Sequence, residues 1–180
     1  MPASVATKKL LSLPEYKAAK RLSVYLSMPF GEISTTAIVH DAFKSGKKVY
    51  VPYIYKLDTE ITNGRSSVME MLALYSIDDF ESLRLDKWGI PSLGEDTIVT
   101  RENIIGGFGI PPALTAPDEN DRSGLDLIIM PGLAFDENLR RLGHGMGYYD
   151  HFLMKYWGGE EANAGRASQK PYLGKGTQKP

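Results

Sequence analysis

The sequence predicts an α/β fold with a largely parallel sheet. Segments with strand-like patterns alternate with segments whose apolar residues recur at helical spacing. Asp126–Met130 (DLIIM) is almost entirely apolar and ends at Pro131-Gly132, which is typical of a strand buried on both faces. Strands separated by helices favour parallel pairing, because a crossover must return the chain to the same end of the sheet.

The first helix and strand are expected before residue 28. Ser12 is predicted to cap a short helix, since Ser is a favoured N-cap and Pro14 then falls in the first turn. Arg21–Ser27 (RLSVYLS) alternates apolar and polar residues, which indicates a strand. A second helix is expected after residues 34–36 (STT). Gly46 occupies the position where helices commonly end in a left-handed residue.

Further strands and one helix complete the predicted fold. Lys48–Pro52 and Ser67–Tyr75 carry the apolar and aromatic residues typical of strands. The pattern predicts a helix over Tyr148–Trp157. Its apolar stripe consists of Tyr149, Phe152, Leu153, Tyr156 and Trp157.

The 180 residues are sufficient for one domain, which we expect over residues 1–157. Arg101–Gly124 is rich in Gly and Pro and has an acidic cluster, so it is expected to be a long surface loop or insertion. Gly158–Pro180 holds many glycines and charges with few apolar residues, and is expected to be a flexible tail.

Composition excludes several classes of function. Lys and Arg number 21 and Asp and Glu 22, so a net charge of −1 favours neither a nucleic-acid nor a membrane partner. The absence of cysteine excludes disulfides, thiolate metal sites and a Cys nucleophile. No apolar run approaches the ~20 residues of a membrane span. We therefore expect a soluble, cytoplasmic monomer, with the mitochondrion as the alternative compartment.

The strongest candidate for chemistry follows the buried strand. Between Arg141 and Gly147 (RLGHGMG), glycine stands at every second position before the last helix. Such glycines allow a tight curl whose N–H groups face phosphate oxygens, Arg141 adds a charged fork, and Asp150 can hold a divalent cation. Alternate glycines also occur in plain tight connections, and the usual nucleotide signatures are missing. These residues alone leave both interpretations open.

A longer comparison favours a specific family. The run Pro131–Asp150 (PGLAFDENLRRLGHGMGYYD) resembles the signature of the 5-formyltetrahydrofolate cyclo-ligase family. Four other segments are similar to the family in the same order: Glu15–Met28, Lys47–Pro52, Trp88–Pro91 and Gly124–Pro131. The resemblance covers about residues 10–157. Relative to the family, the chain is expected to be shortened at both ends, without its N-terminal helix and its closing strands.

The resemblance implies a three-layer α/β/α fold around a Rossmann-like, mostly parallel sheet, of the NagB/RpiA/CoA-transferase-like type. It also implies a reaction that converts 5-formyltetrahydrofolate to 5,10-methenyltetrahydrofolate through an N5-iminium phosphate, with release of ADP and phosphate. ATP is then a co-substrate, Mg²⁺ the cofactor, and both partners small molecules. The alternative is a catalytically inactive, truncated relative that binds folate or nucleotide.

The resemblance assigns roles to particular residues. The ATP-binding residues are expected to be Arg141, Leu142, Gly143, His144, Gly145, Met146, Gly147, Tyr148 and Tyr149. The substrate-binding residues are expected to be Leu26, Glu32, His144, Gly145, Met146, Gly147 and Tyr148. Asp150 is the expected metal ligand and Arg141 the expected catalytic residue. Met69, Met71 and Trp88 are either pocket or core residues, and core is favoured. His151 is expected to be a surface residue.

Overall fold

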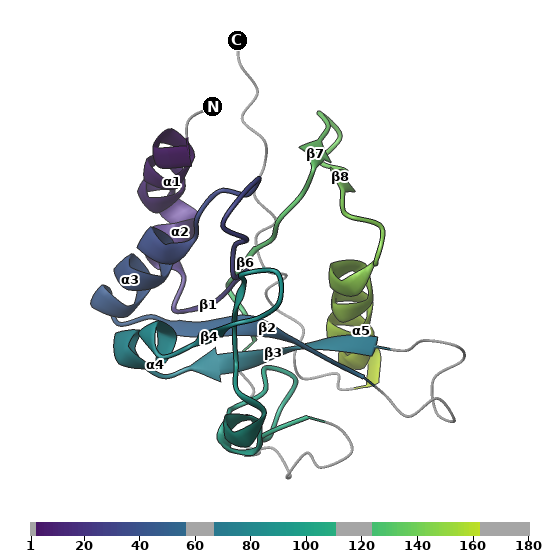
Figure 1. The fold of residues 1–180 in the computed structure, drawn as a ribbon. Helices are drawn as coiled ribbons and strands as arrows, with labels where there is room; N and C mark the ends of the chain where they lie inside the picture. The colour runs from purple at the N-terminus through teal and green to yellow at the C-terminus, as the bar shows by residue number, and fades with distance from the viewer. Residues whose placement is uncertain (1–2, 57–66, 111–123, 163–180) are drawn as a thin grey trace.

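The computed structural model describes residues 3–56, 67–110 and 124–162. Its main sheet has four strands in the order β3-β2-β1-β6 (Figure 1). These strands are β1 (Arg21–Val24), β2 (Lys48–Lys56), β3 (Ser67–Leu74) and β6 (Leu127–Ile129). β1 pairs in parallel with β2 and β6, whereas β2 and β3 are antiparallel. The predicted α/β fold with a mostly parallel sheet is therefore confirmed.

Helices and two small sheets surround this sheet. The helices are α1 (Ala3–Ser12), α2 (Pro14–Ala18), α3 (Thr36–Lys44), α4 (Ile77–Glu81), the 3₁₀ helix η2 (Glu95–Thr100) and α5 (Tyr148–Ala162). One small sheet pairs β4 (Arg84–Leu85) with β5 (Pro91–Ser92), and the other pairs β7 (Ala134–Phe135) with β8 (Arg141–Leu142). In Figure 1, α1, α2 and α3 lie on one side of the molecule and α5 on the other.

The sheet buries apolar side chains on both faces, which makes the structure three-layered. Successive strand residues point to opposite faces. In β2, Val49 and Val51 pack in the cluster that contains Val39 of α3, whereas Tyr50 packs in the cluster that contains Phe152 of α5. All five are almost fully buried. Burial of a large apolar side chain stabilises the fold by about 1.5–3 kcal/mol, so these two layers fix α5 against the sheet.

The N-terminal segment differs from the prediction. A helix, α1, extends over Ala3–Ser12, where the sequence patterns predicted none. Ser12 ends α1 instead of capping α2, and its hydroxyl donates to the Lys9 carbonyl. Leu13 is the N-cap of α2, and Pro14 lies in the first turn as predicted. Short polar side chains bond to the carbonyl three residues earlier as readily as they cap, which explains the error.

A surface loop was predicted from residue 101 onwards, but half of residues 101–110 are buried. Their backbone is irregular, but Arg101, Asn103 and Ile104 are buried. The segment lies beside β3, where the N–H of Ala73 donates to the Glu102 carbonyl and the N–H of Ile104 donates to the Met71 carbonyl. Residues 111–123 of the expected insertion lie outside the described residues. At the chain's other end α5 continues to Ala162, past its predicted end, and residues 163–180 lie outside the described part.

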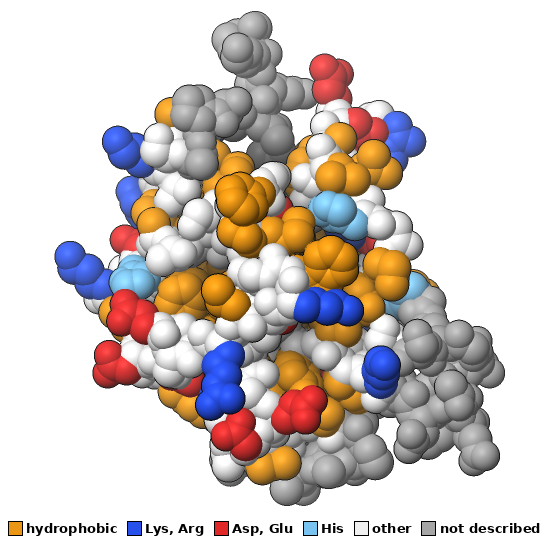
Figure 2. All heavy atoms as spheres, viewed as in Figure 1, with side chains coloured by type: hydrophobic (Ala, Val, Ile, Leu, Met, Phe, Trp, Pro, Cys, Tyr) orange, Lys and Arg blue, Asp and Glu red, His pale blue; other side chains and the backbone are white. Residues whose placement is uncertain are grey.

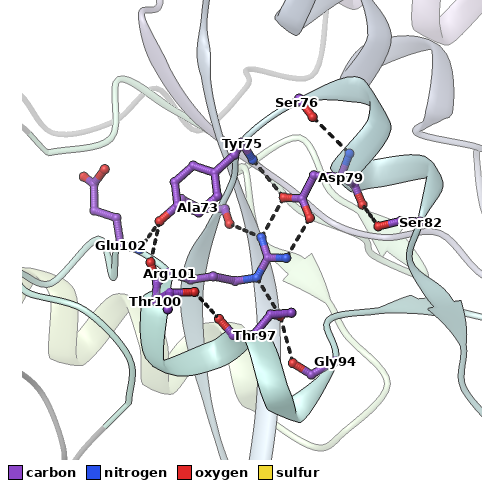
Figure 3. Close-up of polar contacts among 10 residues, drawn as sticks. All are labelled: Ala73, Tyr75, Ser76, Asp79, Ser82, Gly94, Thr97, Thr100, Arg101 and Glu102. Carbon is purple, nitrogen blue, oxygen red and sulfur yellow. Dashed lines mark hydrogen bonds and ion pairs between the residues drawn. The ribbon is translucent and has the colours of Figure 1, made fainter.

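Arg101 connects β3, α4 and η2 through a buried ion pair (Figure 3). Its two terminal nitrogens each donate to one oxygen of Asp79 at 2.7 Å. It also donates to the Ala73 carbonyl and to the Thr97 hydroxyl. These hydrogen bonds from Arg101 lower the pKa of the Asp79 carboxyl below its usual value, against the opposing effect of burial. The hydrogen bonds of Arg101 thus link α4 and η2 to β3.

Candidate functional site

The site lies where two neighbouring parallel strands end. The carboxyl ends of β1 and β6 meet at the same edge of the sheet, and the N–H of Tyr25 donates to the Ile129 carbonyl across this edge at 3.3 Å. β1 continues into the loop that contains Glu32, and β6 continues into Pro131-Gly132. Ligands of open α/β sheets bind beyond the carboxyl ends of the strands. The geometry therefore places the glycine-rich segment at a favoured position.

The β7–β8 hairpin returns the chain from β6 to the base of the site. Its turn is held by Asp136, whose carboxylate accepts the N–H groups of Asn138 and Arg140 and pairs with the Arg140 side chain. Leu139 adopts a positive φ of 64°, which a non-glycine residue tolerates only when its surroundings fix the turn. The hairpin brings Arg141 of β8 back beside Pro131 at the end of β6.

Each glycine of the loop has a structural reason. Gly145 and Gly147 have φ values of +88° and +67°, in the region that favours glycine. A Cβ atom added to Gly143 would lie 2.9 Å from Nη1 of Arg141, so a side chain there would displace the guanidinium. No atom of the described residues lies within 4 Å of a Cβ built on Gly145, so these residues leave open space above the loop. The predicted tight curl is present.

Arg141 and Asp150 form an ion pair across this loop. Nη2 of Arg141 donates to Oδ1 of Asp150 at 2.9 Å, and Nη1 donates to the Pro131 carbonyl at 3.2 Å. The guanidinium also lies over the ring of Tyr149, 5.6 Å from its centroid. The Arg141 side chain is 13% exposed, whereas that of Asp150 is 67% exposed. One partner is thus fixed by the protein and the other faces solvent.

Tyr149 connects the glycine loop to the loop after β1. Its ring is buried, and its hydroxyl has no hydrogen-bond partner among the described residues. Burial raises the pKa of Tyr149, and the charges of Glu32 and Tyr25 add to that rise, whereas Arg141 opposes it. Burial followed by the charge of Glu32 also raises the pKa of Tyr25 to about 12. The charge of Glu32, a predicted substrate residue, thus acts on Tyr25 and on Tyr149, which follows the glycine loop.

Glu32 itself is held in a turn. Its Oε2 accepts the N–H of Met28 at 2.8 Å, and the hydroxyl of Tyr25 donates to the Ile33 carbonyl in the same loop. Leu26, the other residue predicted to bind substrate from this segment, is buried in the cluster that α1–α4 share with the sheet. Its side chain lies on the opposite face of the sheet from α5.

The remaining predicted residues fall into exposed and buried groups. His144 and Met146 are exposed, and Tyr148 is half-buried with its hydroxyl 2.8 Å from Ser67 Oγ. Met69 and Met71 are core residues, as favoured. Trp88 is 66% exposed, so its favoured assignment to the core is wrong. It follows Lys87 in a polar turn whose N–H groups bond to Asp86, and this turn holds the indole outside the core.

Exposed apolar side chains are frequent around these loops. On the glycine-loop side they belong to Leu133, Phe135, Leu142 and Met146, and in the loops after β1 and β4 to Phe30 and Trp88. Figure 2 shows hydrophobic side chains exposed across much of one face of the molecule. A Cβ built on Gly89 would lie 3.0 Å from the Pro29 ring, so the loops that carry Phe30 and Trp88 touch.

His151 was predicted to be an ordinary surface residue, but it contacts the glycine loop. It is half-buried, and its Nδ1 lies 2.5 Å from the Gly147 carbonyl oxygen. A Cβ on Gly147 would lie 3.0 Å from Cε1 of the same ring. The sequence signal was the four-residue spacing of Gly147 and His151 at the predicted start of the helix, because this spacing places a side chain beside the residue one turn earlier.

Asp150 is the predicted metal ligand. No group of three or more His, Cys, Asp or Glu side chains suited to a metal occurs among the residues described. Asp150 offers one exposed carboxylate beside a loop of N–H groups. Mg²⁺ commonly binds through one or two carboxylates together with substrate phosphates and waters, so this set fits Mg²⁺ carried by a nucleotide. Within the described ranges, no helix has the length and apolarity that a membrane crossing requires.

Comparison with known proteins defines the class. Residues 2–169 match the model of the 5-formyltetrahydrofolate cyclo-ligase family. The chain therefore belongs to this family.

Named relatives agree with the family assignment. A Schizosaccharomyces pombe protein named probable 5-formyltetrahydrofolate cyclo-ligase is 36% identical over 83% of this chain and 59% of its own length. The mouse 5-formyltetrahydrofolate cyclo-ligase is 34% identical over 83% of this chain and 61% of its own. An Arabidopsis thaliana relative, named as the mitochondrial enzyme, is 32% identical over 83% and 48%. The chain thus spans about three fifths, or less, of the length of these relatives.

Proposed function

We propose that this chain converts 5-formyltetrahydrofolate to 5,10-methenyltetrahydrofolate with consumption of ATP and release of ADP and phosphate. Membership of the cyclo-ligase family supports this reaction. The reaction is proposed for a single domain over residues 1–157, acting as a monomer. The proposed compartment is the cytosol, with the mitochondrion, which the name of the Arabidopsis relative states, as the alternative.

The observation that carries the proposal is the ion pair between Arg141 of β8 and Asp150 in the first turn of α5. Arg141 and Asp150 meet beside a glycine loop with open space above it. A nucleotide bound as its Mg²⁺ complex needs both charges, because the guanidinium attracts phosphate oxygens and the carboxylate attracts the metal. In the proposed complex a phosphate oxygen replaces Asp150 as the acceptor of Nη2, and Asp150 holds Mg²⁺.

The proposed chemistry has two steps. The formyl oxygen attacks the γ-phosphorus, and the bond from that phosphorus to the ADP oxygen breaks, which leaves an N5-iminium phosphate. N10 then bonds to the formyl carbon, phosphate leaves with the former formyl oxygen, and N10 releases its proton. Phosphorylation is required because an amide oxygen is a poor leaving group. The second step is fast because N10 is tethered to the same scaffold.

Residues of this chain serve the first step mainly by position and charge. Arg141 holds the γ-phosphate and stabilises charge as the phosphoryl group moves. The N–H groups of the loop from Gly143 to Tyr148 bind the other phosphate oxygens. Mg²⁺, when bound at Asp150, neutralises phosphate charge. Glu32 contacts the folate ring system from the loop after β1, close to Tyr149.

A spectroscopic assay tests this function. The full chain is mixed with Mg²⁺, ATP and 5-formyltetrahydrofolate, and the near-ultraviolet absorbance of the methenyl product is followed. We expect a rise that requires ATP and one ADP per product. The second candidate is an inactive relative that binds folate or nucleotide. A folded chain that binds ligand without turnover would establish that candidate instead.

A further inference from the structure

We infer that His151 is a positioning residue that directs a backbone N–H of the glycine loop at the nucleotide phosphates. The inference rests on the proposed function, since it concerns the same loop. It assigns a role to a side chain that was predicted from the sequence to be an ordinary surface residue. The residue acts through Gly147, and it does not itself touch the phosphates.

Two groups of His151 contact one carbonyl oxygen of the glycine loop. The Gly147 carbonyl oxygen accepts the backbone N–H of His151 at 3.0 Å and also contacts Nδ1 of the same residue at 2.5 Å. A carbonyl oxygen only accepts hydrogen bonds, so Nδ1 must carry the proton. The imidazole therefore donates from Nδ1, whichever state Nε2 has.

The Gly147 carbonyl shares its peptide unit with the N–H of Tyr148. The C=O of Gly147 and the N–H of Tyr148 belong to one planar trans peptide and point in opposite directions. His151 fixes the C=O toward the first turn of α5, so the N–H of Tyr148 points away from the helix. Tyr148 is the first residue of α5, and its N–H has no acceptor in the part of the chain that the structure describes.

Gly147 needs a restraint that fixes the orientation of the peptide unit after it. Its φ of +67° lies in a region where glycine has wide freedom, so the orientation of the next peptide is not fixed by sterics alone. The imidazole adds to the restraint from the His151 N–H, because its Cε1 and Nδ1 lie 3.0 and 3.1 Å from the position that a Cβ of Gly147 would occupy. A donor on the C=O also polarises the peptide and strengthens its N–H as a donor to phosphate.

Two variants of matched shape test the inference. In His151→Asn the side-chain amide nitrogen occupies the place of Nδ1 and still donates, whereas His151→Leu has a methyl group there. We expect His151→Leu to raise the Kd for Mg-ATP roughly fivefold, the value of one neutral hydrogen bond. His151→Asn should stay within about twofold of the wild type by the same reasoning. The Kd for 5-formyltetrahydrofolate and the melting temperature should be the same in both variants.

Three results would overturn the inference in different ways. Equal ATP affinity in both variants removes the positioning role. Parallel losses of ATP affinity, folate affinity and melting temperature in His151→Leu mean that the side chain only stabilises α5. A wild type that binds folate but no ATP overturns the proposed function, and the inference with it. If His151→Leu does not fold, ¹⁵N NMR of the wild-type ring decides, since an unprotonated Nδ1 contradicts the geometry.

Discussion

Two arginine–aspartate pairs in this protein have similar geometry and different surroundings. Arg101 pairs with Asp79 at 2.7 Å and lies 5.7 Å from the ring centroid of Tyr75, and Arg141 pairs with Asp150 at 2.9 Å and lies 5.6 Å from that of Tyr149. Each arginine also donates to a backbone carbonyl. The aspartates differ, because the Asp79 side chain is 19% exposed and that of Asp150 is 67% exposed.

Exposure of the aspartate separates a structural pair from one that we propose binds a ligand. Both oxygens of Asp79 bond to Arg101, and one of them also accepts the Tyr75 N–H, so both are already engaged within the protein. Asp150 accepts a hydrogen bond from Nη2 of Arg141 and faces solvent beside a loop with positive-φ glycines. A pair that is buried and saturated stabilises the fold, whereas a pair with one exposed partner can exchange it for a ligand.

The largest expected effect concerns Asp150. Replacing it in Asp150→Ala removes the proposed Mg²⁺ ligand, and we expect methenyl formation to fall about 10³-fold, as when a transition-state contact is lost. The melting temperature should hardly change, since the side chain is mostly exposed. Glu137→Ala, which removes an exposed acid of the nearby hairpin, is the matched control and should keep full activity. Full activity in Asp150→Ala would remove Asp150 from the site.

The next effect is on stability. Arg101→Ala leaves the Asp79 carboxylate without its buried partner, so the free energy of unfolding should fall by about 3 kcal/mol in urea titrations. Arg84→Ala changes an exposed arginine of β4 and should alter stability by less than about 0.5 kcal/mol. Equal losses in the two variants would show that the buried pair contributes no more than a surface residue.

The Arg101 pair also predicts a dependence on pH. The pKa of Asp79 is lower in the folded state than in the unfolded chain, so its contribution is present above the unfolded pKa of about 3.9. That contribution is lost as the pH falls through the folded pKa. The stability difference between the wild type and Asp79→Asn should therefore shrink from about pH 5 to about pH 3. A constant difference over that range would contradict the lowered pKa.

The smallest expected effect is a gain in metal-free affinity for ATP. Asp150→Asn frees Arg141 from its ion pair while preserving the shape of the side chain. Affinity for ATP measured without metal should then rise, by at most about fivefold, because an exposed pair is worth up to about 1 kcal/mol. Isothermal titration with EDTA present measures this, and adding Mg²⁺ should help the wild type only. A variant with weaker metal-free binding would mean that the two residues do not compete.

Much of the fold follows from local sequence patterns. Val39 and Ala42 share a helical face, and Gly46 ends α3 with a positive φ of 69° as predicted. The apolar run after Asp126 forms β6, where Leu127 and Ile128 pack on opposite faces of the sheet. Periodicity and glycine placement act over a few residues, so they can be read without knowledge of the tertiary structure.

The wrong predictions concern residues whose burial is decided by contacts with residues distant in the sequence. Arg101 and Asn103 resemble loop residues in sequence, but they have partners distant in the chain, Asp79 for Arg101 and Glu70 of β3 for Asn103. Trp88 is apolar, but its turn holds it outside the core. In the site, the glycine curl was predictable from spacing, whereas the Arg141–Asp150 pair depends on the exact path of the loop between them. Local patterns do not encode such long-range geometry.

The most direct test of this account compares three arginine variants in the absorbance assay, with each initial rate divided by the fraction of folded protein. Arg101→Ala should keep the wild-type rate per folded molecule, because its pair is structural. Arg140→Ala, whose exposed pair with Asp136 holds only the hairpin turn, should do the same. Arg141→Ala should lose methenyl formation while it remains folded. An Arg141→Ala protein that works at the wild-type rate would contradict the account.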